Sequence, residues 1–196
     1  MLRNTFRIFC VGAMLALFSS NVFAGEVHEA AKNGQISKLK MLLEKDPTLL
    51  YAADEVGKTP LHWAVGRGQI AVIKLLLDIY HVKADIRNAN EGTPLHVAAS
   101  QAQPEAARIL IAHGFDVNAR TKNGSTPLHF AAIKGGKPGH LEVARILVEH
   151  GADVNAWTDN GATPLSMAMY RGNMQIIDLL RAHGAKSANA LREGKL

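Results

Sequence analysis

Several features that mark other classes of protein are scarce in this sequence of 196 residues. It has one cysteine, Cys10, and 6% aromatic residues, whereas 47% of the chain is hydrophobic. A single thiol cannot form an internal disulfide, and beyond the N-terminal region no thiol is present to act in catalysis. The hydrophobic content is too high for a disordered chain, so the fold must rest on side-chain packing.

Long hydrophobic runs are also missing, apart from one near the N-terminus. Residues 8–18 form an apolar run that follows Arg3 and Arg7 and precedes Val22-Phe23-Ala24, which has small residues at its first and third positions. This order is typical of a secretory signal peptide, and we expect cleavage after Ala24. A retained membrane anchor and a buried helix are the alternatives, but the run is short for a membrane span. After cleavage we expect no membrane association.

The sequence also lacks a large excess of charge of either sign, and its positive excess is small. Removal of residues 1–24 takes away two of the 22 basic residues and none of the 17 acidic ones, so the net charge falls from +5 to +3. Such a small and dispersed excess gives no reason to expect nucleic-acid binding. The signal sequence predicts a periplasmic or secreted protein instead.

Internal repetition is what the sequence does have. Thr59-Pro60-Leu61-His62 recurs as Thr93-Pro94-Leu95-His96, Thr126-Pro127-Leu128-His129 and Thr163-Pro164-Leu165-Ser166, at spacings of 34, 33 and 37 residues. An aliphatic block follows each copy, and Asp-Val-Asn-Ala stands at 116–119 and again at 153–156. Blocks that recur in a fixed order predict a stack of similar units.

Each block has a local structural role. The threonine can cap a helix N-terminus, and proline suits the first helical position because its missing amide has no partner there. Glycine after His113, His150 and His183 suits the left-handed residue that ends a helix, and a histidine there favours the negative end of the helix dipole. We expect Asp-Val-Asn-Ala to be extended and to lead into a turn.

This pattern resembles the ankyrin repeat, whose signature is Thr-Pro-Leu-His-x-Ala. Thr59 to Ala64, Thr93 to Ala98 and Thr126 to Ala131 match it in full, and the resemblance covers about Val27 to Ala185. It implies an all-α solenoid of stacked helix-turn-helix units with β-hairpin-like finger loops.

The resemblance also divides the chain. We expect a signal peptide at 1–24, an ankyrin repeat domain at 25–186 and a polar tail at 187–196. The expected units are about 26–57, 58–91, 92–124, 125–161 and 162–186. Three departures from the pattern are Asp78 to Lys83, which replaces a His-Gly turn, Gln103-Pro104 at a helix start, and an insertion at Gly135 to Pro138, which we expect to lie in a loop.

Nine histidines raise the question of a metal site or a catalytic site. The resemblance implies that His62, His96 and His129 bond a neighbouring loop. His28-Glu29 begins a zinc-protease motif, but Lys32 stands where the second histidine would be. The chain has no Gly-x-Ser-x-Gly elbow and no phosphate loop. We therefore predict no catalytic residue, no metal and no cofactor.

Ankyrin stacks typically bind protein partners in a concave groove, and the register of the repeats predicts which residues face it. The set leans basic, which favours a partner with an acidic surface. The predicted groove residues are Arg67, Gln101, Arg120, Lys122, Asn123, Ile133, Lys134, Trp157, Asp159, Asn160, Tyr170 and Arg171.

The functional hypothesis is a monomeric, non-enzymatic binding module outside the cytoplasm, with its partner centred on Lys134, Trp157 and Tyr170. One alternative is a secreted effector of a host-associated bacterium that acts on a eukaryotic protein, and another is an assembly element without a transient partner. Trp157 also has a purely structural interpretation, in which it packs on the neighbouring finger.

Overall fold

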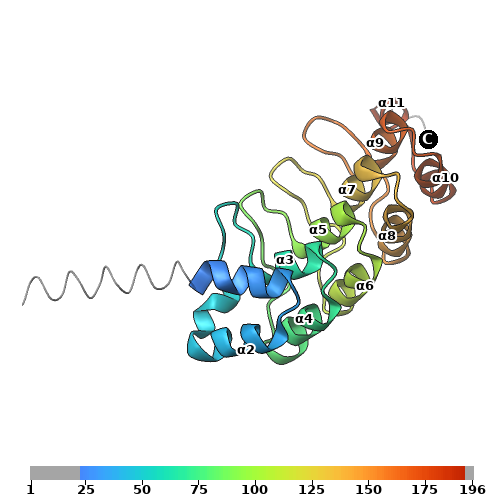
Figure 1. Ribbon diagram of the computed structural model, residues 1–196. Helices are drawn as coiled ribbons and strands as arrows, with labels where there is room; N and C mark the ends of the chain where they lie inside the picture. Colours follow the sequence, from blue (N-terminus) through green and yellow to red (C-terminus); the bar gives the residue numbers. More distant parts are fainter. Residues whose placement is uncertain (1–22, 193–196) are drawn as a thin grey trace, which may run out of the picture.

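The computed structural model describes residues 23–192, and all regular secondary structure in that range is helical. Consecutive helices run back and forth, and each pair packs on the next to make a curved stack, with the finger loops on the inside of the curve (Figure 1). The helical stack confirms the predicted fold class. Most of the predicted signal peptide lies outside the described residues.

The helices form two rows (Figure 1). The row beside the fingers consists of α3 (Pro60–Gly66), α5 (Pro94–Gln101), α7 (Pro127–Lys134) and α9 (Pro164–Tyr170). The outer row consists of α2 (Ile36–Lys45), α4 (Ile70–Lys74), α6 (Pro104–Ala112), α8 (Pro138–Glu149) and α10 (Met174–Ala182). A helix at residues 23–32 precedes α2, and the remaining segments are η1 (Pro47–Tyr51), η2 (Leu75–Ile79) and α11 (Ala188–Arg192).

The signature residues start the inner helices as the sequence predicts. In α7, Thr126 is the extended N-cap residue and Pro127 follows as the first helical residue. Leu128 and Ala131 are fully buried, and their equivalents in α3, α5 and α9 are buried as well. The small alanine allows neighbouring inner helices to approach closely, which keeps the stack compact. Pro104 likewise opens α6 without disrupting it.

The departure after Leu77 takes the form of a π-helical turn. Over Leu75–Ile79 the helix widens, and the amide of Tyr80 donates to the carbonyl of Leu75. All three leucines, 75 to 77, are buried. His81 then adopts a left-handed φ of 51°, the conformation that Gly114 and Gly151 supply in the two following units.

The expectation that Asp-Val-Asn-Ala is extended is wrong. The carboxylate of Asp116 accepts the amide of Asn118 at 2.8 Å, which folds the segment into a turn. The turn directs the Asn118 side chain to the next unit, where Nδ2 donates to the carbonyl of Gly151 and Oδ1 accepts the amide of Asp153. Asn155 repeats both bonds with Gly184 and Lys186.

The insertion at Gly135 to Pro138 is only partly a loop, which corrects the expectation from the sequence. Pro138 is the first residue of α8, which has 12 residues where α6 and α10 have 9. Proline is preset for the first helical position, so the inserted segment lengthens the helix. His140, in the added turn, is buried, and its Nε2 lies 3.3 Å from the carbonyl oxygen of Ser100.

The fingers are closed by turns and joined to one another through the main chain. In the second finger, the amide of Asn88 donates to the carbonyl of Gly92. The amide of Ala89 donates to Val56, that of Lys122 to Asn90, and that of Asp159 to Asn123, which links successive fingers. The loops are hairpin-like in this bonding, although the described residues contain no β-strand.

Candidate protein-binding groove

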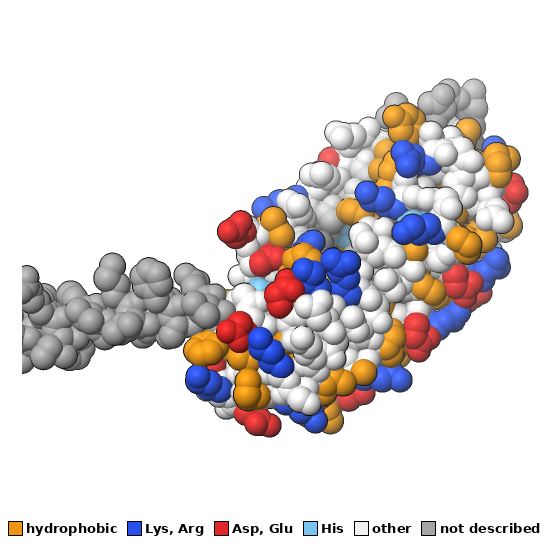
Figure 2. Space-filling model, in the orientation of Figure 1, with side chains coloured by type: hydrophobic (Ala, Val, Ile, Leu, Met, Phe, Trp, Pro, Cys, Tyr) orange, Lys and Arg blue, Asp and Glu red, His pale blue; other side chains and the backbone are white. Residues whose placement is uncertain are grey.

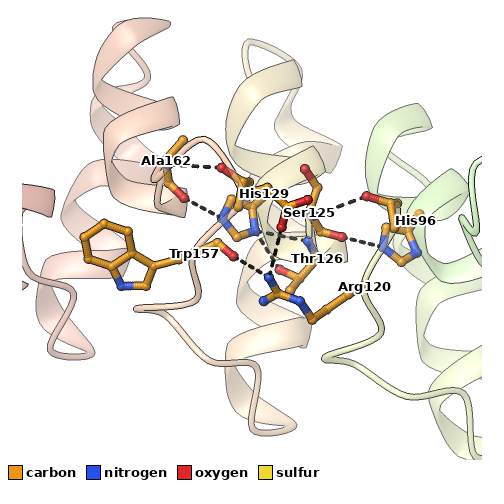
Figure 3. Close-up of polar contacts among 10 residues, drawn as sticks. His96, Arg120, Ser125, Thr126, His129, Trp157 and Ala162 are labelled. Atoms are coloured by element: carbon orange, nitrogen blue, oxygen red, sulfur yellow. Dashed lines mark hydrogen bonds and ion pairs between the residues drawn. The ribbon is translucent and has the colours of Figure 1, made fainter. Parts of the chain in front are cut away.

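The three signature histidines connect consecutive units. Nε2 of His62, His96 and His129 lies 3.1–3.2 Å from the carbonyl oxygens of Gly92, Ser125 and Ala162 respectively. In each case Nδ1 accepts the amide of the preceding threonine, so the ring carries its proton on Nε2 and donates it to the next loop (Figure 3). This arrangement matches what the ankyrin resemblance implies.

Burial keeps these histidines neutral. It disfavours the protonated ring and lowers the pKa of His62, His96 and His129 from 6.5 to about 4, although the bond to the loop carbonyl acts in the opposite direction. A neutral ring with both nitrogens engaged has no free base to offer a substrate. The three side chains are therefore structural.

Histidines at the ends of the outer helices make a different bond. Nδ1 of His113, His150 and His183 donates to the carbonyl four residues earlier, at 2.7–2.8 Å. His113 also places Nε2 at 2.8 Å from the Asp78 carboxylate. The bond to the carbonyl of Ile109, with that of Asp78, raises the pKa of His113. The helix-dipole interpretation from the sequence is thus supplemented by a direct hydrogen bond.

A hollow of about 400 Å³ lies on the concave side, between the second and third fingers and the helices α3, α5 and α7. Its size is in the range of small ligand sites. Its lining residues are Lys58, His62, Trp63, Gly66, Arg67, Asn88, Asn90, Gly92, His96, Val97, Ser100, Gln101, Thr121 and Phe130.

The floor of this hollow is a row of apolar side chains. Trp63, Val97 and Phe130 each follow the signature histidine, and all three are half-buried. The ring of Phe130 stands edge-on to that of His96, with the centroids 5.4 Å apart. The prediction from the sequence missed this row, because the variable position of Thr-Pro-Leu-His-x-Ala was not assigned to the groove.

Two lysine side chains at the Trp63 end of the hollow contact the indole ring of that residue. Nζ of Lys58 lies 4.7 Å and Nζ of Lys32 5.4 Å from the Trp63 ring centroid, distances typical of cation–π contacts. The indole Nε1 donates to the Asp54 carboxylate at 3.0 Å. The hydrogen bonds that Asp54 accepts from Lys58, Trp63 and Val56 lower its pKa, against the effect of burial.

Arginines brace the fingers on the other side of the groove. Arg87 donates to the carbonyls of Glu91 and Arg120, and Arg120 in turn donates to the carbonyl of Trp157 at 2.8 Å (Figure 3). The Arg120 guanidinium also lies 3.9 Å from the Asp159 carboxylate. The bond from Arg87 to Glu91 lies within one finger, whereas the others cross from one finger to the next and hold the rim of the groove in a defined shape.

The structure does not bring all the predicted groove residues into one hollow. Arg67 and Gln101 line it, whereas Arg171 borders a separate depression of about 330 Å³ beside Gly135. Tyr170 is 83% exposed. Ile133 and Trp157 are half-buried, and the remaining members are exposed, namely Arg120, Lys122, Asn123, Lys134, Asp159 and Asn160.

Basic side chains are prominent along this face. In Figure 2, Lys and Arg side chains gather near the middle of the visible surface and recur toward the C-terminal units. Among the predicted groove residues, Arg67, Arg120, Lys122, Lys134 and Arg171 are basic and only Asp159 is acidic. Basic residues therefore outnumber acidic ones within this predicted set.

Within residues 23–192, no group of three or more His, Cys, Asp or Glu side chains is placed to hold a metal ion. None of the helices in the same range combines the length and the apolar character of a transmembrane segment. His140 is the one described residue with a buried side-chain nitrogen, Nδ1, that lacks a hydrogen-bond partner.

Comparison with known proteins agrees with the geometry. A family model described as "Ankyrin repeats (3 copies)" matches residues 27–121 and 114–190, which together make up most of the chain. No curated protein matches the sequence well enough to add a named relative. The histidine bonds between units and the hydrogen bonds between fingers agree with this match. The chain therefore belongs to the ankyrin-repeat family.

Proposed function

We propose that this chain is a non-enzymatic module that works outside the cytoplasm and holds a protein partner in its concave groove. Ankyrin repeats suggest protein–protein interaction as the general activity. The observation that carries the proposal for this chain is the hollow with an apolar floor and a basic border. Apolar surface ringed by polar groups is typical of interaction sites, and Trp, Tyr and Arg contribute most to binding energy.

The groove also has the rigidity that binding requires. From residue 58 onward, the histidine bonds and the arginine bonds tie each unit to the next, so few groups must become ordered when a partner arrives. A surface that is already in its bound shape loses less entropy on association. Basic residues without carboxylate partners in the described range, including Lys122 and Lys134, would speed the approach of an acidic partner.

Export is part of the proposal and rests on the N-terminal sequence. The basic start, the short apolar run and the ending Val22-Phe23-Ala24 support a cleaved signal peptide and a periplasmic or secreted protein. We propose that the mature protein is a monomer, because a stack with its own helical caps needs no second copy for folding.

Cross-linked pull-down from the exported fraction tests this function. The bait is the mature chain, alongside an Arg67→Glu variant in the groove and a matched Arg145→Glu variant on the outer helix α8. We expect a partner that the wild type and the outer-helix variant retain and that the groove variant loses. A partner found only in the cytosol, or one retained equally by both variants, would contradict the proposal.

A further inference from the structure

We propose that the hollow between α3, α5 and α7 receives an extended protein segment in which an apolar side chain is flanked by acidic ones. The apolar side chain lies over Val97, between Trp63 and Phe130, and the acidic side chains meet Lys58 and Arg67. This inference rests on the proposed function and specifies the chemistry of the partner. It also moves the main contact from the units around Trp157 to those around Val97.

The apolar row sets the length of the bound segment. Trp63, Val97 and Phe130 occupy the same position on three consecutive inner helices, and α5 packs directly on both α3 and α7. Packed helices are about 8–10 Å apart, so the row spans roughly 16–20 Å. An extended chain rises about 3.3 Å per residue, so about six residues cover the row. A single small molecule would cover only part of it.

The polar lining suits an extended main chain. A bound strand brings amide and carbonyl groups that must find partners when water leaves. Asn90 from the finger side and Gln101 from the end of α5 line the hollow with amide groups, and each amide can donate and accept. Ser100 and Thr121 add hydroxyls on the same two sides, where Ser100 Oγ donates to the carbonyl of Val97 and can still accept, and Thr121 Oγ1 accepts the amide of Ser125 and can still donate. Main-chain bonding of this kind does not depend on the partner's sequence. The apolar floor and the basic residues therefore determine which sequences bind.

The charges select acidic flanks. Lys58 is held over the Trp63 ring, so its long side chain is already positioned next to the apolar floor. Arg67 lies at the other side of the hollow and has no carboxylate within ion-pair distance among the described residues. Two nearby acids are engaged locally, since Asp54 accepts the indole N–H and two main-chain amides and Glu29 pairs with Lys32. The exposed Glu91 lies in the finger between Asn90 and Gly92 and has no ion pair among the described residues. No acidic side chain lines the hollow itself, and the charged residues of its lining, Lys58 and Arg67, are both basic.

Selection from a random peptide library tests the inference. Phage displaying randomised 12-residue segments are enriched on the folded mature protein, and the enriched peptides are synthesised with a fluorophore for anisotropy titration. We expect sequences with a large apolar residue and at least two nearby acids. Replacing that apolar residue by serine, or the acids by lysines, should weaken binding on the order of tenfold. Binding should also weaken as salt rises.

Protein variants locate the site. Val97→Glu places a charge in the apolar floor, and Lys58→Glu reverses the charge at the edge of the floor. Each substitution should weaken binding of the selected peptide on the order of tenfold. Lys58→Glu leaves the buried core untouched, so it remains informative if Val97→Glu fails to fold. Arg145→Glu on the outer helix serves as the matched control and should bind normally, with melting curves recorded for all three.

Several outcomes would overturn the inference. These are the absence of any enriched peptide, enrichment of basic or uncharged sequences, or peptides whose affinity survives both groove variants. Competition by a twelve-nucleotide oligo-dT at the peptide's own affinity would assign the groove to nucleic acid instead. If no peptide binds while the pull-down still yields a partner that the groove variant loses, the proposed function stands. Only the inference that the partner binds through an extended acidic segment is then wrong.

Discussion

Nε2 of His129 lies 3.2 Å from the carbonyl oxygen of Ala162, a residue 33 positions further along the chain. The ring is buried in the body of its own unit, and the carbonyl belongs to the finger of the next one. The bond therefore couples two neighbouring units. His62 and His96 repeat the relationship, which makes the stack sensitive to their protonation.

The first prediction is that acid destabilises the protein below pH 6.5. The folded-state pKa of His62, His96 and His129 is lowered to about 4, whereas the unfolded value is near 6.5. Between these values the unfolded chain binds protons that the folded chain does not, so the free energy of unfolding falls as pH falls. We expect a loss of about 1 kcal/mol per pH unit for each histidine.

Urea unfolding at pH 7.5, 6, 5 and 4.5 measures this dependence. His113 acts in the opposite direction, because its bonds to the Ile109 carbonyl and to Asp78 raise its pKa. A His113→Ala variant should therefore show a steeper loss of stability in acid. A His129→Gln variant should show a shallower one, and a flat pH profile for the wild type would contradict the assignment of neutral buried rings.

The second prediction concerns the helix cap at Thr126. Its hydroxyl lies 2.9 Å from Nδ1 of His129, and its amide donates to the same nitrogen at 3.1 Å. Thr126→Ala removes the hydroxyl and should cost about 1 kcal/mol of unfolding free energy. Denaturant titration measures the change. Lys122→Ala, at an exposed finger position, is the control and should change stability little.

The third prediction concerns packing in α8. Leu147 is fully buried in the core between α8 and its neighbours, whereas the adjacent Val148 is half-buried. Leu147→Ala should cost about 2–5 kcal/mol because a cavity remains where the side chain was. Val148→Ala should cost distinctly less. Thermal unfolding followed by circular dichroism compares the two, and an unchanged melting curve for Leu147→Ala would mean that the assigned register is wrong.

The fourth prediction separates two roles for Trp157. The side chain is half-buried, and the residue's carbonyl accepts the Arg120 guanidinium, a main-chain contact that survives Trp157→Ala. If Trp157 anchors a partner, the substitution should weaken binding by about 2 kcal/mol with little change in melting temperature. Reduced stability with intact affinity would show that the indole packs on the neighbouring finger. Lys134→Ala tests whether the same region contributes charge.

The fifth prediction is export with cleavage after Ala24. Intact-mass measurement of the native protein should give a chain that begins at Gly25, and retention of Met1 would contradict the proposal. Cleavage there would remove two residues from the helix at 23–32, including Phe23, whose ring centroid lies 4.2 Å from Nζ of Lys45. Ala24→Leu puts a bulky residue at the cleavage site and should leave the precursor uncut.

The sequence alone determined the features that depend on local interactions. Proline at the first helical position, threonine before it and glycine after His150 each act within a few residues, so helix starts and ends could be predicted from neighbours in the chain. The repetition of these signals also predicted the stack, because units that cannot bury their own apolar face must pack on one another.

Only the tertiary structure decided what happens between units. The place of the hollow, the apolar row at Trp63, Val97 and Phe130, and the Asn118 bridge to Gly151 depend on how far apart successive units sit and how they rotate. That geometry results from the summed packing of buried side chains over the whole stack, which no single repeat encodes. The groove residues of one unit become neighbours of the next only when both are folded, and for that reason the sequence alone did not locate the hollow.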